Sequence, residues 1–317
     1  MEIGICFNPI LGNGVNFQKP RSPRISNLEY YYENICVAFE SIRFFNPKSP
    51  LILYTSSEVP DRYVHILNTI NVKTVFLEPK FIFHSLHPNR FAGSLFLLDC
   101  ISIQNESTLY LDPDVICLSN LNEIELSLDK ISVFNASELV ENIPSIERLK
   151  IFSQEQGCGE LPSDTYFGGE FFYLPQSRIK EVQVRIDEIW KKNINALKKN
   201  SVYLETEEHV LTLALHKISN LAYTRKIHRI WTTRSYRNIP NSISELSFLH
   251  LPAEKDKGIS ELFQNLYIRK HKTNFEVFAI QHRDELFQIL HISLRFKQKM
   301  LLKLFKLVKL ISRPLYH

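Results

Sequence analysis

The chain has 317 residues, of which 44% are hydrophobic and 23% are charged, so global disorder is excluded and a sizeable buried core is expected. The net charge of +4 is unevenly distributed, because the residues after Glu285 include seven basic side chains and no acidic one. The basic character therefore belongs to the tail rather than to the body of the chain.

The five cysteines are widely spaced and form no CxxC pair. Their odd number and spacing argue against a disulfide framework or a zinc site and favour a reducing compartment. The first residues, MEIGICFNPI, lack the charged start and long apolar stretch of a signal peptide. No window reaches about 18 uninterrupted apolar residues, so we expect a cytoplasmic protein without a membrane span.

Short apolar runs alternate with longer amphipathic runs through the first part of the chain. The pattern predicts helices between successive strands, with helices at 27–45, 61–70 and 90–103 and strands at 3–7, 50–56, 73–78 and 107–112. Continuous apolar strands that alternate with helices are typical of a parallel sheet covered on both faces. Ligands of such sheets bind at the carboxyl ends of the strands.

The pattern is looser after residue 120. We predict a loop at 155–164, helices at 177–198 and 204–217, and strands at 130–135, 170–176 and 247–252. The one plausible boundary lies near 258–290. It separates a globular domain, 1–258, from a helical C-terminal region, 259–317.

Two aspartates stand at the end of the strand predicted at 107–112, in the sequence LYLDPDVI (109–116). Residues i and i+2 of an extended segment point the same way, so Asp112 and Asp114 can present both carboxylates to one point. Hard cations such as Mg²⁺ and Mn²⁺ prefer such oxygen ligands and often bridge them to a phosphate. The alternative is a polar turn in which both side chains bond only local backbone.

Four segments, taken in order, resemble nucleotide-sugar glycosyltransferases with the GT-A fold. LYLDPDVICLSNL (109–121) resembles their DxD segment, and DTYFGGEFFYLP (164–175) resembles the donor-sugar segment of glycosyltransferase families 6 and 8. LETEEHVLTLALHK (204–217) resembles the helix that follows it, and FLHLPAEKDKG (248–258) a late segment of family 8. The resemblance implies a Rossmann-like α/β domain with a mainly parallel mixed sheet, and transfer with retention of anomeric configuration.

The same resemblance implies a set of ligand-binding residues. Asp112 and Asp114 would hold Mn²⁺ or Mg²⁺, and His250 would complete the metal shell. Lys255 or Lys257 would meet the diphosphate of a nucleotide sugar, most simply a UDP-sugar. A lone histidine at a strand end can also be structural.

Three glutamates, Glu205, Glu207 and Glu208, cluster at the start of the helix predicted at 204–217. A carboxylate beside an anomeric carbon can act as a nucleophile, stabilise a cationic centre or accept a proton. Alignment selects Glu207 as the catalytic residue, with Glu205 as a second candidate. Ordinary acidic enrichment of a first helical turn explains the cluster equally well.

Two glycines, Gly168 and Gly169, lie within the donor-sugar segment. Glycine allows a close approach of backbone to a ligand, and a plain turn is the alternative. Glu170 follows them and can meet hydroxyl groups of a donor or acceptor sugar.

The basic tail predicts an amphipathic helix at about 291–313. One face carries the cations and the opposite face is apolar, which favours a helix lying in the interface of an anionic membrane over a core helix. Nucleic-acid binding would leave the apolar face unexplained. The cationic face comprises Arg295, Lys299, Lys303, Lys306, Lys309 and Arg313.

Together these features predict a metal-dependent glycosyltransferase on the inner face of a membrane. It would transfer a sugar to a glycan or glycolipid acceptor, such as a growing bacterial surface polysaccharide or lipopolysaccharide. Two alternatives remain, a phosphatase of the haloacid dehalogenase type and a non-catalytic, membrane-bound pseudo-transferase. A phosphatase of this type also has a DxD motif after an apolar strand. It would normally have a later pair of adjacent aspartates as well, and no such pair occurs in this sequence.

Overall fold

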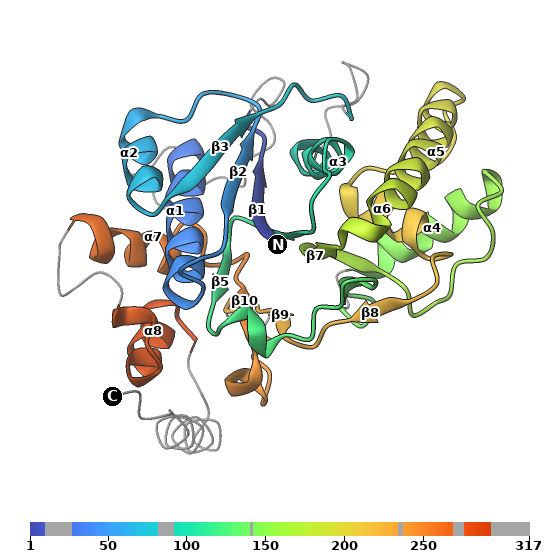
Figure 1. Cartoon of the computed structure of the whole chain (residues 1–317). Coiled ribbons are helices and arrows are strands. Elements are labelled where there is room, and N and C mark those ends of the chain that lie inside the picture. Colours follow the sequence, from blue (N-terminus) through green and yellow to red (C-terminus); the bar gives the residue numbers. More distant parts are fainter. Residues whose placement is uncertain (10–26, 82–91, 140–141, 234–236, 269–275, 293–317) are drawn as a thin grey trace. The chain divides into compact units, whose positions relative to one another are not determined.

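The computed structural model describes residues 1–9, 27–81, 92–139, 142–233, 237–268 and 276–292 (Figure 1). These residues form two compact units, each built from segments that are separate in the sequence. Unit 1 contains the described residues within 1–18, 49–113 and 125–224. Unit 2 contains those within 19–48, 114–124 and 225–317.

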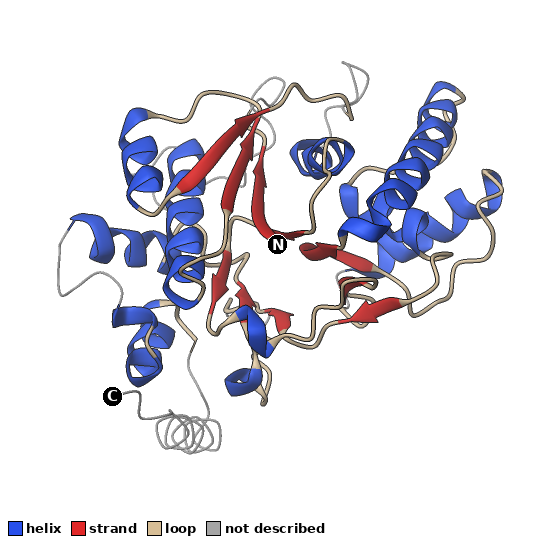
Figure 2. Ribbon diagram, viewed as in Figure 1, coloured by secondary structure: helices blue, strands red, loops and turns tan. Residues whose placement is uncertain are grey.

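Unit 1 contains a seven-stranded sheet in the order β3-β2-β1-β4-β7-β6-β8, drawn red in Figure 2. Its first four strands in this order are parallel, and β7 runs antiparallel to both β4 and β6. The residues of β2 and β4 are buried throughout, as expected for apolar strands covered on both faces. The strands are β1 (Glu2–Phe7), β2 (Leu51–Thr55), β3 (Val72–Phe76), β4 (Thr108–Leu111), β6 (Ile131–Asn135), β7 (Phe167–Leu174) and β8 (Leu221–Tyr223).

Five α-helices of the described chain accompany this sheet. The long helix α5 (Ile179–Lys198) buries one apolar face and packs against α6 (Glu207–Leu215), as Figure 1 shows for the two yellow helices. Helix α3 (Phe96–Ser102) follows a 3₁₀ turn at Ala92–Leu95 and contacts β1, α5 and α6. The others are α2 (Asp61–Thr69) and α4 (Ile143–Glu155).

Unit 2 contains a three-stranded sheet in the order β5-β10-β9, with bounds Val115–Cys117, Phe248–His250 and Ile227–Arg229. Helix α1 (Asn27–Phe45) packs against β5 and against α7 (Gly258–Phe263), which continues as a π-helical turn at Gln264–Ile268. Buried polar contacts reinforce this packing, because Ser260 donates a hydrogen bond to Glu33. Helix α8 (Arg283–Ile289) begins with a buried arginine that donates to the carbonyl oxygen of Leu118.

The predicted fold class is confirmed, because the main sheet is mixed and mainly parallel. Most predicted helices and strands lie within two or three residues of their observed bounds. Helix α4 and strands β5, β8 and β9 were not predicted. The alternative of a plain turn at FGGEF is wrong, since Gly168 and Gly169 lie inside β7.

The amphipathic helix predicted at 291–313 lies outside the described residues, apart from its first two positions. Within the part of the chain that the structure describes, no helix combines the length and apolarity required to cross a bilayer. The domain boundary near residue 258 stays a prediction.

Candidate active site

Asp114 lies where the chain enters β5, and strand pairing holds it beside His250. The antiparallel register places His250 opposite Val115, and the Leu251 amide donates to the Asp114 carbonyl oxygen at 3.1 Å. The Nε2 atom of His250 lies 3.2 Å from Oδ2 of Asp114. Both side chains are buried, and Asp114 is 0% exposed. Backbone pairing of two short strands therefore fixes this carboxylate–imidazole pair.

Lys255 supplies positive charge to the same carboxylate. Its Nζ atom lies 3.4 Å from Oδ2 of Asp114 and 5.4 Å from the ring centroid of Tyr31. Burial by itself would raise the pKa of Asp114, but Lys255 and His250 outweigh it and hold that pKa below its ordinary value. The carboxylate is therefore ionised at neutral pH. Lys257, the other predicted phosphate-binding lysine, is exposed at the residue before α7.

The arrangement around Asp114 fits a divalent metal. Both carboxylate oxygens of Asp114 are buried, and neither accepts a hydrogen bond of good geometry from the described residues, although His250 and Lys255 lie close. Asp112 is tied to Asp114 through a single proline. One ligand atom from each of Asp112, Asp114 and His250 lies within 4.8 Å of the other two. Two carboxylates and one imidazole suit Mg²⁺ or Mn²⁺.

Glu207, in unit 1, opens helix α6. Thr206 precedes it as the N-cap, where its hydroxyl accepts a hydrogen bond from the His209 amide at 3.4 Å. Glu207 is only 7% exposed, and its Oε2 atom has no hydrogen-bond partner among the described residues. Burial and then the Glu208 carboxylate raise the pKa of Glu207 to about 8, while a hydroxyl bond from Ser94 opposes them and Asp112 adds to them. The carboxyl group is therefore largely neutral at pH 7.

The two glycines of β7 make room for carboxylates. A Cβ atom at Gly168 would collide with the side chain of Glu170, and one at Gly169 would collide with that of Glu207. Glu170 itself is fully buried. The sequence predicted a close approach of a ligand to this backbone. The structure shows that side chains of the protein also approach it, and the contact with a ligand stays a prediction.

Glu205 lies in different surroundings from Glu207. Its carboxylate forms an ion pair of 3.2 Å with Arg148, and its amide donates to Nδ1 of the buried His209 at 3.1 Å. Burial lowers the pKa of His209 to about 3, with a contribution from Arg148, so the imidazole is neutral. This network stabilises the approach to α6, and the catalytic role predicted for Glu205 stays a prediction.

In each unit, some residues that contact the candidate residues were not predicted. Tyr166 donates a hydrogen bond to Glu208, Ser94 bonds Glu207, and Tyr31 lies beside Lys255. Tyrosine and serine are common in cores and turns, so the sequence around them carries no specific signal. Only their contacts in the fold identify them.

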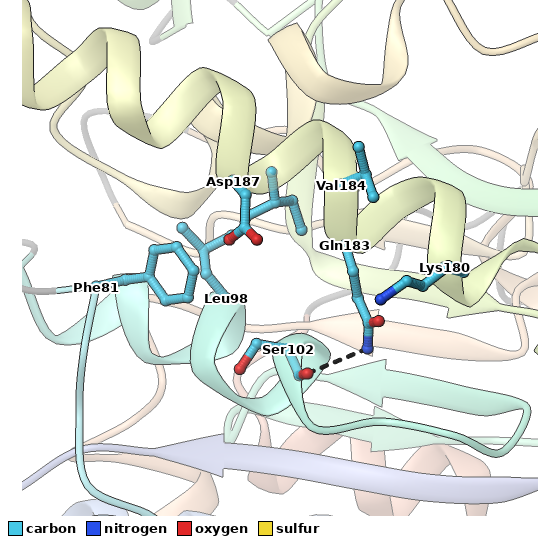
Figure 3. A pocket seen from close by; sticks show the side chains of 8 residues that line it. Phe81, Leu98, Ser102, Lys180, Gln183, Val184 and Asp187 are labelled. Atoms are coloured by element: carbon cyan, nitrogen blue, oxygen red, sulfur yellow. Dashed lines mark hydrogen bonds between the residues drawn. The ribbon is translucent and has the colours of Figure 1, made fainter.

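A small cavity of about 140 Å³ in unit 1 shares no lining residue with these groups (Figure 3). Phe81, α3 and α5 line it, and Gln183 donates to the Ser102 carbonyl oxygen at 3.1 Å across one side. Lys180 and Asp187 give it a mixed polar lining.

Comparison with known proteins bears on the fold. No family model and no curated protein matches the chain. A crystal structure of the galactosyltransferase LgtC in complex with donor and acceptor sugar analogues is similar, with 13% identity and a TM-score of 0.50. The similarity covers 87% of this chain and 99% of that chain. The apo form of mouse xyloside xylosyltransferase 1 has 12% identity and a TM-score of 0.49, over 80% of this chain and 98% of that one.

At this identity the likeness to the galactosyltransferase establishes the fold rather than the reaction. The chain therefore has the GT-A glycosyltransferase fold.

Proposed function

We propose that the protein is a metal-dependent glycosyltransferase that takes its sugar from a nucleoside diphosphate donor, most simply a UDP-sugar. The observation that carries this proposal is the group formed by Asp112, Asp114 and His250 in a chain with the GT-A fold. A bound Mn²⁺ or Mg²⁺ would act as a Lewis acid that stabilises negative charge on the departing diphosphate.

The chain's own residues have separate tasks in this proposal. Lys255 holds donor phosphate as a point charge, because its ammonium group already lies beside Asp114. Lys257 is exposed and makes at most a peripheral contact. Asp114 and His250 are held by strand pairing, so their positions do not depend on the ligand.

Glu207 acts at the reacting centre in this proposal. Its Oε2 atom has no partner among the described residues, and the Asp112 carboxylate contributes to its raised pKa. A buried carboxyl group with a pKa near the working pH suits proton transfer or a hydrogen bond to a sugar hydroxyl. Glu170, Gly168 and Gly169 would shape the adjoining donor or acceptor subsite.

The acceptor is proposed from the sequence. The basic amphipathic segment at about 291–313 favours a glycan or glycolipid at an anionic membrane surface, on its inner, cytoplasmic face. Co-sedimentation with anionic vesicles tests this part separately. Unchanged sedimentation after removal of residues 291–317 would reject it.

The decisive experiment measures release of UDP from a panel of UDP-sugars with Mn²⁺, with Mg²⁺ and with a chelator. We expect release that depends on the metal and is lost in Asp112→Asn and Asp114→Asn. Release that continues in the chelator or in both variants would reject the metal-dependent reaction. Donor binding without release or transfer would favour the pseudo-transferase. The observed fold gives the phosphatase alternative no support.

A further inference from the structure

Strand β7 extends beyond its partner β4, which leaves backbone donors to be satisfied. The register pairs Leu111, the last residue of β4, with Phe171, and Pro113 offers no N–H with which to continue the ladder. Residues 167–170 of β7 therefore extend past the end of β4. Buried amides in such a position require other acceptors.

Helix α6 supplies those acceptors through side chains of two successive turns. The Phe167 amide donates to the Thr212 hydroxyl at 3.0 Å, and the Gly169 amide donates to Oε1 of Glu208 at 3.2 Å. Oε2 of the same glutamate accepts a hydrogen bond of 2.7 Å from the Tyr166 hydroxyl. Glu208 thus joins two points of the segment around β7 to the first turn of α6.

This junction lies directly beside Glu207. Gly169, whose amide bonds Glu208, is also the residue whose missing Cβ leaves room for the Glu207 side chain. A shift of the Gly169 backbone would therefore change the space available to Glu207. Because both oxygens of Glu208 accept structural hydrogen bonds, that residue is poorly placed to react itself.

We propose that Glu208 is a positioning residue for the transfer reaction. By accepting hydrogen bonds from Tyr166 and from the Gly169 amide, its carboxylate holds β7 against the start of α6 and fixes the side chain of Glu207. This inference rests on the proposed function of Glu207.

The charge of Glu208 provides a readout that a purely structural role would not move. Among the groups that act on Glu207, the Glu208 carboxylate is the charge that contributes most to its raised pKa. Asp112 also raises that pKa, the Ser94 hydroxyl lowers it, and the nearby His209 is neutral. Removing the charge of Glu208 therefore lowers the pKa of Glu207, whereas removing the Tyr166 hydroxyl leaves the charge in place.

The first test does not depend on activity. Tyr166→Phe, Glu208→Ala and the double variant are compared by urea unfolding, with Glu188→Gln on the exposed face of α5 as control. We expect the unfolding equilibrium constant of the double variant to be about tenfold smaller than the two single variants predict if their effects are additive. The control should unfold as the wild type does. Additive effects would overturn the proposed clamp.

The second test uses metal-dependent donor hydrolysis by the whole chain. We expect Tyr166→Phe to lower kcat about tenfold with little change in KM and an unchanged pH profile. Glu208→Gln should lower kcat, because one amide oxygen replaces two carboxylate oxygens as hydrogen-bond acceptor. It should also move the pH profile of activity to lower pH, because the negative charge is lost. Glu208→Ala should lower kcat further than either.

Two outcomes of the second test would overturn the proposal. Full kcat in Tyr166→Phe would show that the bond positions nothing. Equal abolition of activity in Glu208→Gln and Glu208→Ala, with Tyr166→Phe unaffected, would assign Glu208 to the chemistry itself. Absence of donor hydrolysis in the wild type would instead reject the proposed function, and the unfolding test would still decide whether the clamp exists.

Discussion

Each unit of the protein contains a buried carboxyl group that the sequence predicted to be functional, and the two groups have opposite electrostatic surroundings. In unit 2, Lys255 and His250 keep Asp114 ionised despite complete burial. In unit 1, Glu207 is buried beside Glu208 and Asp112, and its pKa is raised to about 8. Burial alone therefore does not decide the charge of a carboxyl group, because neighbouring charges can reinforce or reverse its effect. An ionised carboxylate suits metal binding, and a neutral one suits proton exchange with a sugar.

The strongest test of this contrast removes the ionised group. We expect Asp114→Asn to lower metal-dependent donor hydrolysis about 10³-fold, because charge stabilisation by a metal contributes several kcal/mol. The melting temperature should also stop responding to Mn²⁺. Asp129→Asn, at an exposed aspartate, is the matched control. Retained activity together with a retained Mn²⁺ response would refute metal binding at Asp114.

The next test removes the ionisable group in unit 1. Glu207→Gln keeps the size of the side chain but cannot exchange a proton, so we expect kcat to fall about 10²-fold. Binding of Mn²⁺, measured by thermal shift, should remain. If kcat stayed within twofold of the wild type, Glu207 would have no role at the reacting centre.

Lys255 and Lys257 provide a matched pair of variants that tests which lysine binds the donor. Lys255→Ala should weaken donor hydrolysis about 10- to 100-fold, because a hydrogen bond to a charged group contributes about 1.5–3 kcal/mol. Lys257→Ala should change it little, since that side chain is exposed. Steady-state kcat/KM of the two variants decides between them, and a larger loss at Lys257 would reverse the assignment.

The pH dependence of stability sharpens the contrast without any substrate. The pKa of Glu207 rises on folding from 4.5 to about 8, so the stabilisation by its neutral form is full below pH 4.5 and is lost progressively as pH rises from there through about 8. The pKa of His209 falls from 6.5 to about 3, so its contribution is present above pH 6.5 and is lost toward pH 3.

Urea unfolding between pH 5 and pH 9 is the measurement for this prediction. Relative to the wild type, the free energy of unfolding of Glu207→Gln should increase by up to roughly 1.4 kcal/mol per pH unit between about pH 5 and the folded-state pKa, and should level off above it. A constant difference would show that the pKa of Glu207 is not raised. His209→Gln should lose less stability than the wild type on acidification below pH 6.

Much of the fold follows from local pattern. Continuous apolar runs such as those of β2 and β4 identify buried parallel strands, and Pro113 marks where β4 ends. Thr206 followed by acidic residues marks the start of α6. These signals are local because helix caps, strand ends and burial are determined by a few neighbouring residues. Strands β5, β8 and β9 have three residues each, too few to show a period.

The details of the site depend on contacts between distant segments. The sequence offered both Lys255 and Lys257, and only the turn after β10 determines that Lys255 lies beside Asp114. It identified Glu207 by alignment, but the pairing of Glu208 with Tyr166 joins residues 42 positions apart. The excess length of β7 over β4 depends on strand register, which local composition does not specify.

The adjacent glycines of β7 also bear on which substitutions the protein can accept. Gly157 has φ of +58° and open space around it, so its constraint is conformational and asparagine is a tolerable replacement there. Gly168 and Gly169 are constrained by volume, because each adjoins a carboxylate that any side chain would displace. In a saturation scan, asparagine should therefore survive at residue 157 and be rejected at residues 168 and 169. The pattern of accepted substitutions would thus show, without any bound ligand, where the side chains of Glu170 and Glu207 lie.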